Sequence, residues 1–208
     1  AFKLTNAIYA VAMGLAVLSV PLPWRARIGA GLCLALVALA VFVLLAGPWL
    51  FEVWSSFGNP LFPQFNAWFQ APLAPPLSIG DQRWLPHSLG EALLRPLAYT
   101  ANPYLVSEIA LLQVVWALLY VVAIVALLAW VGRRLGWIRG GGAVTASSGV
   151  RRMLGVFVLA GYVLWLAMFS IHRYLVVLEL LAPLVLWLLL HWLLAPRLAG
   201  RIAAVSIA

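Results

Sequence analysis

The sequence is poor in charged side chains, which make up only 9% of its 208 residues. Soluble domains carry about 25% charged and about 45–50% apolar residues, whereas this chain is 66% hydrophobic. A water-soluble fold cannot hide that much apolar surface. The length instead suits about five membrane spans of roughly 20 apolar residues each, joined by loops.

Cysteine and acidic residues are also rare, with one Cys and five Asp or Glu. The single Cys33 lies in an apolar run, which excludes an internal disulfide framework and paired-thiol redox chemistry. No group of His, Cys or carboxylate residues has metal-ligand spacing, and no glycine-rich loop followed by Lys indicates a phosphate-binding loop. We therefore expect no metal and no cofactor. The net charge of +8 would suggest nucleic acid for a soluble protein, but in a membrane protein the placement of basic residues is a topology signal, so no nucleic-acid partner is expected.

Long apolar runs dominate what is present. Each can cross the hydrocarbon core as a helix, the open-chain conformation that satisfies its own backbone groups in lipid. The fold class predicted is all-α: a polytopic transmembrane bundle forming one domain over 1–208. The expected spans are about 4–22, 28–49, 104–131, 153–171 and 174–195, with a large outer loop at 50–103 and a cytoplasmic loop at 132–152.

The basic residues predict an orientation. Nine of the thirteen Lys and Arg fall in three segments that the spans place on one side, and no acidic residue lies there. The positive-inside rule makes that side cytoplasmic, with the N-terminus outside and the C-terminus inside. Arginines in the Gly- and Ser-containing loop 132–152 serve mainly to fix this topology, or contact anionic headgroups. Because Ala1 is not methionine and 4–22 lacks a convincing signal cleavage site, we expect a processed or incomplete chain.

The outer loop is long, aromatic and rich in proline, holding eight of the 13 prolines. Phe65, Trp68 and Phe69 have i, i+3, i+4 spacing, which predicts a short interfacial helix that buries the three rings together. Ser88 and Glu91 form a capping-box pattern that predicts a second helix, kinked or ended by Pro96. The loop is therefore expected to fold as a cap, able to wall a cavity open to lipid.

Polar residues near the membrane are the candidate site. Glu179 lies one to two turns into the last span, where an ionisable side chain is costly unless it is paired or hydrated. We expect its partner on another span or in the outer loop; the alternatives are a buried pair that fixes packing and a group that contacts substrate. Seven residues are candidates for binding substrate or lipid phosphate: Arg173, His172, Glu179, Asn59, Asn66, His87 and Arg83. No residue can be assigned a catalytic role.

Three stretches together resemble bacterial polytopic glycosyltransferases of the GT-C type. They are Lys3-Leu4-Thr5-Asn6, the run from Gly58 to Asn66 (GNPLFPQFN), and Ile171-His172-Arg173-Tyr174-Leu175 followed by Glu179-Leu180-Leu181. The resemblance covers most of the chain, as the later, C-terminal half of such an enzyme. The family's catalytic acidic residues lie in the first large outer loop and have no counterpart here, so either that part is absent from this chain or the protein does not perform the chemistry. It implies a bacterial inner-membrane protein, a polyprenyl-phosphate-linked sugar as donor, Arg173 on the lipid phosphate and a carboxylate as base.

The alternative is a non-enzymatic transmembrane subunit that packs against a larger membrane protein complex. The partners expected under the two hypotheses are membrane lipids, a polyprenyl-phosphate-linked sugar, or other membrane subunits. A transporter is less favoured because no pair of spans shows the broken-helix symmetry typical of transporter sites.

Overall fold

The computed structural model describes residues 4–77, 82–137 and 148–194, and every regular element in these ranges is helical. Parts of two of the three predicted basic segments lie outside the described residues, and with them Arg139, Arg197 and Arg201. Lys3 also lies outside them. The main helices are α1 (Ala7–Ser19), α2 (Trp24–Phe57), α5 (Val114–Arg134), α6 (Ser148–Met168) and α7 (Val176–Leu193). Shorter helices are α3 (Asn66–Phe69) and α4 (Leu89–Ala101), with 3₁₀ turns η1 (Leu4–Asn6), η2 (Pro103–Leu105) and η3 (His172–Tyr174).

Four of these helices, α2, α5, α6 and α7, are long and apolar enough to cross a membrane. At 1.5 Å per residue, the 21 residues of α5 and of α6 extend about 31 Å, close to the roughly 30 Å of a hydrocarbon core. The first predicted span is shorter than expected: α1 has 13 residues, about 20 Å. It ends at Ser19, just before Pro21 and Pro23. The expected count of five spans is therefore not confirmed.

Two helices differ in extent from the predicted spans. The second helix starts at Trp24 and runs through Pro48 to Phe57, so the first residues assigned to the outer loop are helical. It ends at Gly58, whose φ of 70° is left-handed backbone that glycine adopts without strain. The third begins at Val114 instead of 104. Asn102 caps the η2 turn instead, by accepting a hydrogen bond from the Tyr104 N–H.

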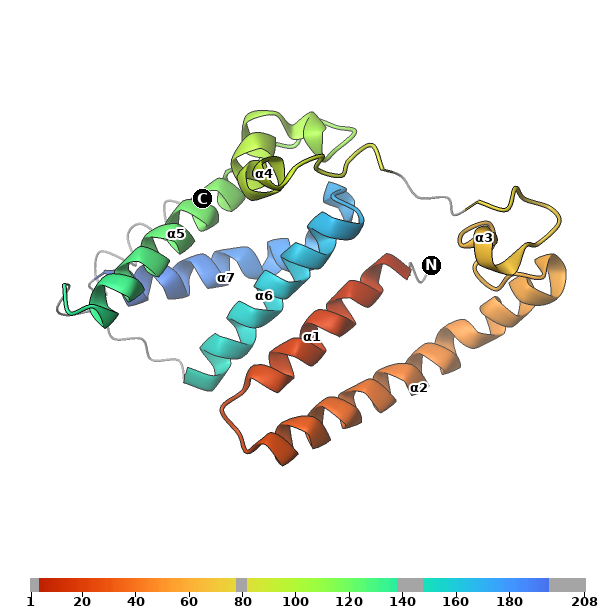
Figure 1. Ribbon diagram of the computed structural model, residues 1–208, viewed down its shortest axis with the longest axis horizontal. Coiled ribbons are helices and arrows are strands. Elements are labelled where there is room, and N and C mark those ends of the chain that lie inside the picture. Colours follow the sequence, from red (N-terminus) through yellow and green to blue (C-terminus); the bar gives the residue numbers. More distant parts are fainter. Residues whose placement is uncertain (1–3, 78–81, 138–147, 195–208) are drawn as a thin grey trace.

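Small residues at helix contacts set the packing. α1 lies along α6, and α5 lies beside α7 (Figure 1). Ala12, Ala16 and Ala182 are fully buried, and a Cβ added at Gly161 would lie 3.1 Å from Leu178 Cδ2. Close approach through small residues is the usual way transmembrane helices associate, because lipid offers no hydrophobic driving force between them.

The helices alternate in direction, so the bundle has two chemically different ends. Arg27 and Arg152 donate from their guanidinium groups to carbonyls at the end of α1, Leu18 O at 3.2 Å and Ser19 O at 3.5 Å. Arg133 stacks on the Trp192 ring, 4.0 Å from its centroid. We call this the basic end, defined by Arg25, Arg27, Arg133, Arg134, Arg151 and Arg152. The opposite end, called the His172 end, carries η3, α4 and the start of α7 (Figure 1).

The outer loop holds one predicted helix as expected and one that differs. In α4, the Ser88 hydroxyl accepts from the Glu91 N–H at 3.1 Å, which confirms the predicted cap, and the helix continues past Pro96 to Ala101. The interfacial helix is reduced to four residues because Phe65 and Gln70 both take left-handed backbone. Phe65, Trp68 and Phe69 are all exposed on the protein surface, Trp68 at 81%.

Candidate functional site at the His172 end

The connection between α6 and α7 builds the site. After α6 ends, Ser170 takes positive φ (51°) and the Trp165 indole N–H donates to Ile171 O at 2.8 Å. The His172 N–H then donates to Val106 O at 2.7 Å. These bonds fix η3 against the irregular segment before α5, so α6 and α7 are joined by a short turn that contains His172 and Arg173.

His172 and Glu179 form the centre of the site. The short η3 turn and the first turn of α7 place His172 Nε2 2.6 Å from Glu179 Oε1, with the side chains 11% and 20% exposed. The contact is an ion pair when the imidazole is protonated, although neither atom has a hydrogen bond of good geometry. The ion-pair partner of Glu179 is therefore His172 in the η3 turn, four residues before α7 begins, and not a residue on another span or in the outer loop.

Three tyrosines from different helices lie at this end: Tyr9 and Tyr99 are close enough to interact with the Glu179 charge, and Tyr162 lies beside Tyr99. The Tyr9 hydroxyl of α1 donates to Tyr174 O. Tyr99 of α4 and Tyr162 of α6 have buried hydroxyls without a hydrogen bond of good geometry. Burial, then the neighbouring Tyr162 and the negative charge of Glu179, raise the pKa of Tyr99, so its phenol stays protonated and able to donate. We define the polar cluster as His172, Glu179, Tyr9, Tyr99 and Tyr162.

Arg95 anchors the α4 side of this end. Its side chain is almost wholly buried and pairs with Glu91 one turn earlier, as their spacing predicts. It also donates to Leu105 O at 2.9 Å and to Trp84 O. The His87 N–H donates to Glu91 Oε2 at 2.9 Å, and this bond, before the Arg95 charge, lowers the pKa of Glu91. Glu91 and Arg95 therefore tie α4 to the chain segments just before and just after it.

The predicted candidates divide into three groups. His172 and Glu179 meet, and Arg173 lies beside them, exposed, with its guanidinium 5.3 Å from the Tyr174 ring centroid. Arg83 and His87 are exposed residues leading into α4. Asn59 and Asn66 lie near α3, which Figure 1 shows at the end of α2 and apart from α4.

Asn59 and Asn66 organise their own loop. Both are fully buried. The Asn66 amide donates to Ala71 O, Ala74 O and Pro75 O at 2.8–3.0 Å and its Oδ1 accepts from the Ala71 N–H at 2.9 Å. Asn59 accepts from the Leu61 N–H and donates to Gln64 O, both at 2.9 Å. With their polar atoms used in this way, the two amides replace regular secondary structure across the GNPLFPQFN stretch.

Sequence reasoning missed the tyrosines and the buried role of Arg95. Tyrosine in an apolar helix is indistinguishable from an interfacial anchor unless the neighbours of its hydroxyl are known. Arg95 carried one signal, its spacing from Glu91. Among the described residues, no three His, Cys, Asp or Glu side chains are grouped closely enough to hold a metal ion.

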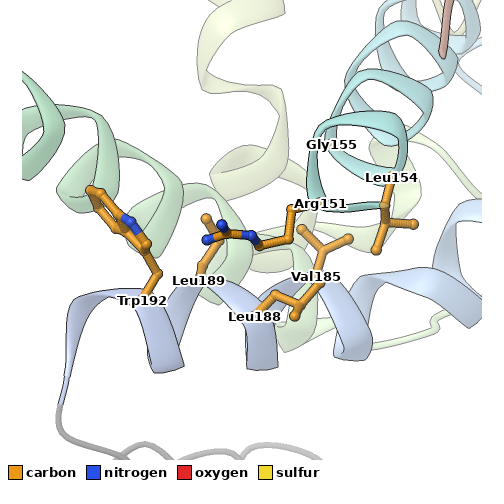
Figure 2. A pocket seen from close by; sticks show the side chains of 7 residues that line it. All are labelled: Arg151, Leu154, Gly155, Val185, Leu188, Leu189 and Trp192. Carbon is orange, nitrogen blue, oxygen red and sulfur yellow. The ribbon is translucent and has the colours of Figure 1, made fainter. Parts of the chain in front are cut away.

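A pocket lies at the other end of the molecule. It has a volume of about 200 Å³ and lies between α6 and α7 at the basic end, where Arg151 and Trp192 flank leucine and valine side chains (Figure 2). It is therefore not the cavity predicted beneath the outer loop.

Comparison with known proteins gives no relative: no protein-family model, no curated protein and no solved structure matches this chain.

Proposed function

We propose that the chain is an integral membrane protein that binds a polyprenyl-phosphate-linked sugar at the His172 end and takes part in glycosyl transfer. The observation that carries this proposal is the polar cluster, an ionisable pair beside the buried phenol hydroxyls of Tyr99 and Tyr162 at one end of an otherwise apolar bundle. Ionisable groups buried in membrane helices are costly. They therefore mark substrate or ion sites more often than they serve ordinary packing. The sequence resemblance to the later half of GT-C glycosyltransferases names the substrate class.

Each group has a chemical role in this proposal. Arg173 is exposed beside the cluster and presents a planar guanidinium, which binds phosphate oxygens through paired hydrogen bonds. The Glu179 carboxylate, still 20% exposed, would accept the proton of an acceptor hydroxyl. His172 would position that carboxylate, while the Tyr99 and Tyr162 hydroxyls supply hydrogen bonds to sugar hydroxyls.

The proposed orientation follows from the two ends. The basic end faces the cytoplasm under the positive-inside rule, and the His172 end faces the outside of a bacterial inner membrane. The N-terminus is then outside and the C-terminus inside. This places the polar cluster on the side where polyprenyl-linked donors of the GT-C type are used.

Binding of polyprenyl phosphate to the chain in nanodiscs tests the proposal. We expect Arg173→Gln to weaken binding about tenfold or more, because a charge-assisted hydrogen bond contributes about 1.5–3 kcal/mol. Arg25→Gln is the matched control, since Arg25 lies at the basic end near Trp24. Equal affinities of the two variants would contradict the assignment of the phosphate site.

Glu179→Gln separates binding from proton transfer. The amide keeps the size of the side chain but is a poor proton acceptor. We expect polyprenyl phosphate binding within about twofold of the parent protein, and loss of sugar transfer from a polyprenyl-phosphate-sugar donor. Unchanged transfer would return Glu179 to a purely structural role.

The alternative, a subunit of a larger membrane complex, is favoured by one observation. Among the described elements, α2 has its main contacts with α1, and Leu36, Leu44 and Trp49 remain 66%, 75% and 69% exposed. The exposed Cys33 on this helix is the only cysteine and serves as a crosslinking site. Mild extraction followed by thiol crosslinking should then yield a specific larger species that Cys33→Ser abolishes. A monodisperse single chain would exclude this alternative.

A further inference from the structure

The groove between α6 and α7 combines an apolar floor with a positive charge. Leu154 and Gly155 of α6 face Val185 and Leu189 of α7 across it. Figure 2 shows the Arg151 side chain extending from α6 over α7 in the direction of Trp192. The groove has a volume of about 200 Å³, below the roughly 300–1,000 Å³ of sites for drug-sized ligands. A segment of one hydrocarbon chain therefore fits it better than a bulky ring system.

Arg151 differs from its basic neighbours in having no partner. Arg152 donates to Ser19 O, and Arg133 stacks on Trp192. Arg151 is half-buried, its Nε is shielded from solvent, and it has no hydrogen bond or ion pair among the described residues. A half-buried guanidinium without a counter-ion is unfavourable.

The surroundings make an anion the missing partner. Residues 109–178 contain no Asp or Glu, so α5 and α6 offer no carboxylate, and Glu179 belongs to the opposite end. Arg151 also lies in the first turn of α6, where the helix dipole disfavours positive charge. An anion bound there would interact favourably with both the guanidinium and the helix terminus.

We infer that this groove is a binding site for an anionic phospholipid, whose acyl chain lies against Leu154, Val185 and Leu189 and whose phosphate pairs with Arg151. Basic pockets between transmembrane helices are typical sites for such headgroups. Trp192 also lines the groove. Indole rings are enriched at the headgroup boundary of membranes, so its position suits a bound lipid headgroup. The site is separate from the polar cluster and does not depend on glycosyl transfer.

The experiment measures lipid binding to the full chain by native mass spectrometry in detergent, with dioleoyl phosphatidylglycerol, the zwitterionic dioleoyl phosphatidylcholine and short-chain dihexanoyl phosphatidylglycerol as probes. We expect tight binding of the first alone. Arg151→Gln should weaken it about fivefold, the effect of about 1 kcal/mol per basic residue near an anionic surface. Arg25→Gln, the same charge change at the same end, should leave it unchanged.

A second variant tests the apolar half of the site. A Cβ at Gly155 meets nothing within 4 Å, so Gly155→Leu should fold normally while filling the groove. We expect it to weaken dioleoyl phosphatidylglycerol binding about as much as Arg151→Gln does, with Gly29→Leu, equally open, as the control. The inference is overturned if Arg151→Gln and Arg25→Gln behave alike, if Gly155→Leu binds normally, or if the short-chain lipid binds as well as the long one.

Discussion

The His172–Glu179 pair offers the sharpest test of how this bundle is held together. The perturbation is a double-mutant cycle with His172→Phe and Glu179→Leu, which replace each partner by an apolar side chain of similar bulk. With Nε2 and Oε1 2.6 Å apart and both side chains largely buried, either single change leaves a polar group without its partner. Such uncompensated groups cost about 3–5 kcal/mol when fully buried, and the 20% exposure of Glu179 lowers our expectation to about 2 kcal/mol for each single variant.

The double variant is expected to be nearly as stable as the parent protein. Replacing both members of a buried pair by apolar groups is often close to neutral, so we expect a loss of about 1 kcal/mol and a coupling energy of about 3 kcal/mol. The assay is reversible unfolding in mixed micelles of mild detergent and dodecyl sulfate, followed by tryptophan fluorescence. Additive losses, with a coupling energy below about 0.5 kcal/mol, would refute the claim that the pair is a coupled buried contact.

Three further outcomes are expected. Gly161→Val should lower the free energy of unfolding by about 1–3 kcal/mol, because its side chain would press on Leu178; Gly155→Val is the control, and equal losses would contradict the close packing at Gly161. Asn66→Ala should speed limited proteolysis between residues 59 and 75 without changing the unfolding of the bundle, because it removes four hydrogen bonds between the Asn66 side chain and the loop backbone. Unchanged cleavage would exclude a role of Asn66 in holding this loop. Because the folded state holds the pKa of Glu91 below 4.5, its contribution to α4 is present above about pH 4.5 and is lost as the pH falls through the folded pKa. Proteolysis of α4 should then accelerate in acid, and Glu91→Gln should remove that pH dependence.

Local signals in the sequence predicted the elements that depend on neighbouring residues. The apolar runs located α2, α5, α6 and α7, because a helix that satisfies its own backbone groups needs only length and hydrophobicity to be recognised. Ser88 and Glu91 located the start of α4 for the same reason, since a cap joins residues within one turn. The shortened α1 and the early start of α2 follow from prolines, whose effect on a helix depends on whether neighbouring helices support it.

The predictions that failed needed distances across the chain. The i, i+3, i+4 aromatic pattern in the outer loop indicated an amphipathic helix, but the buried Asn66 gathers the surrounding backbone groups and limits that helix to four residues. The partner of Glu179 was sought on another span, and a 3₁₀ turn supplied it from His172 instead. The spacing argument assumed a regular α-helix and so did not include the 3₁₀ turn that brings His172 to Glu179.

The sequence by itself determined a helical membrane protein with its arginines gathered toward one side, because hydrophobicity and charge are properties of composition and order. Only the tertiary structure decided which polar groups meet. Tyr9 of α1 and Tyr99 of α4 both lie near Glu179 of α7, and the small residues Ala12, Ala16 and Gly161 permit the close packing of α1 and α7 against α6. The position of Arg151 over its groove, without a partner among the described residues, is likewise a consequence of how α6 lies against α7. Contacts of this kind depend on the approach of helices far apart in the chain, which no local pattern encodes.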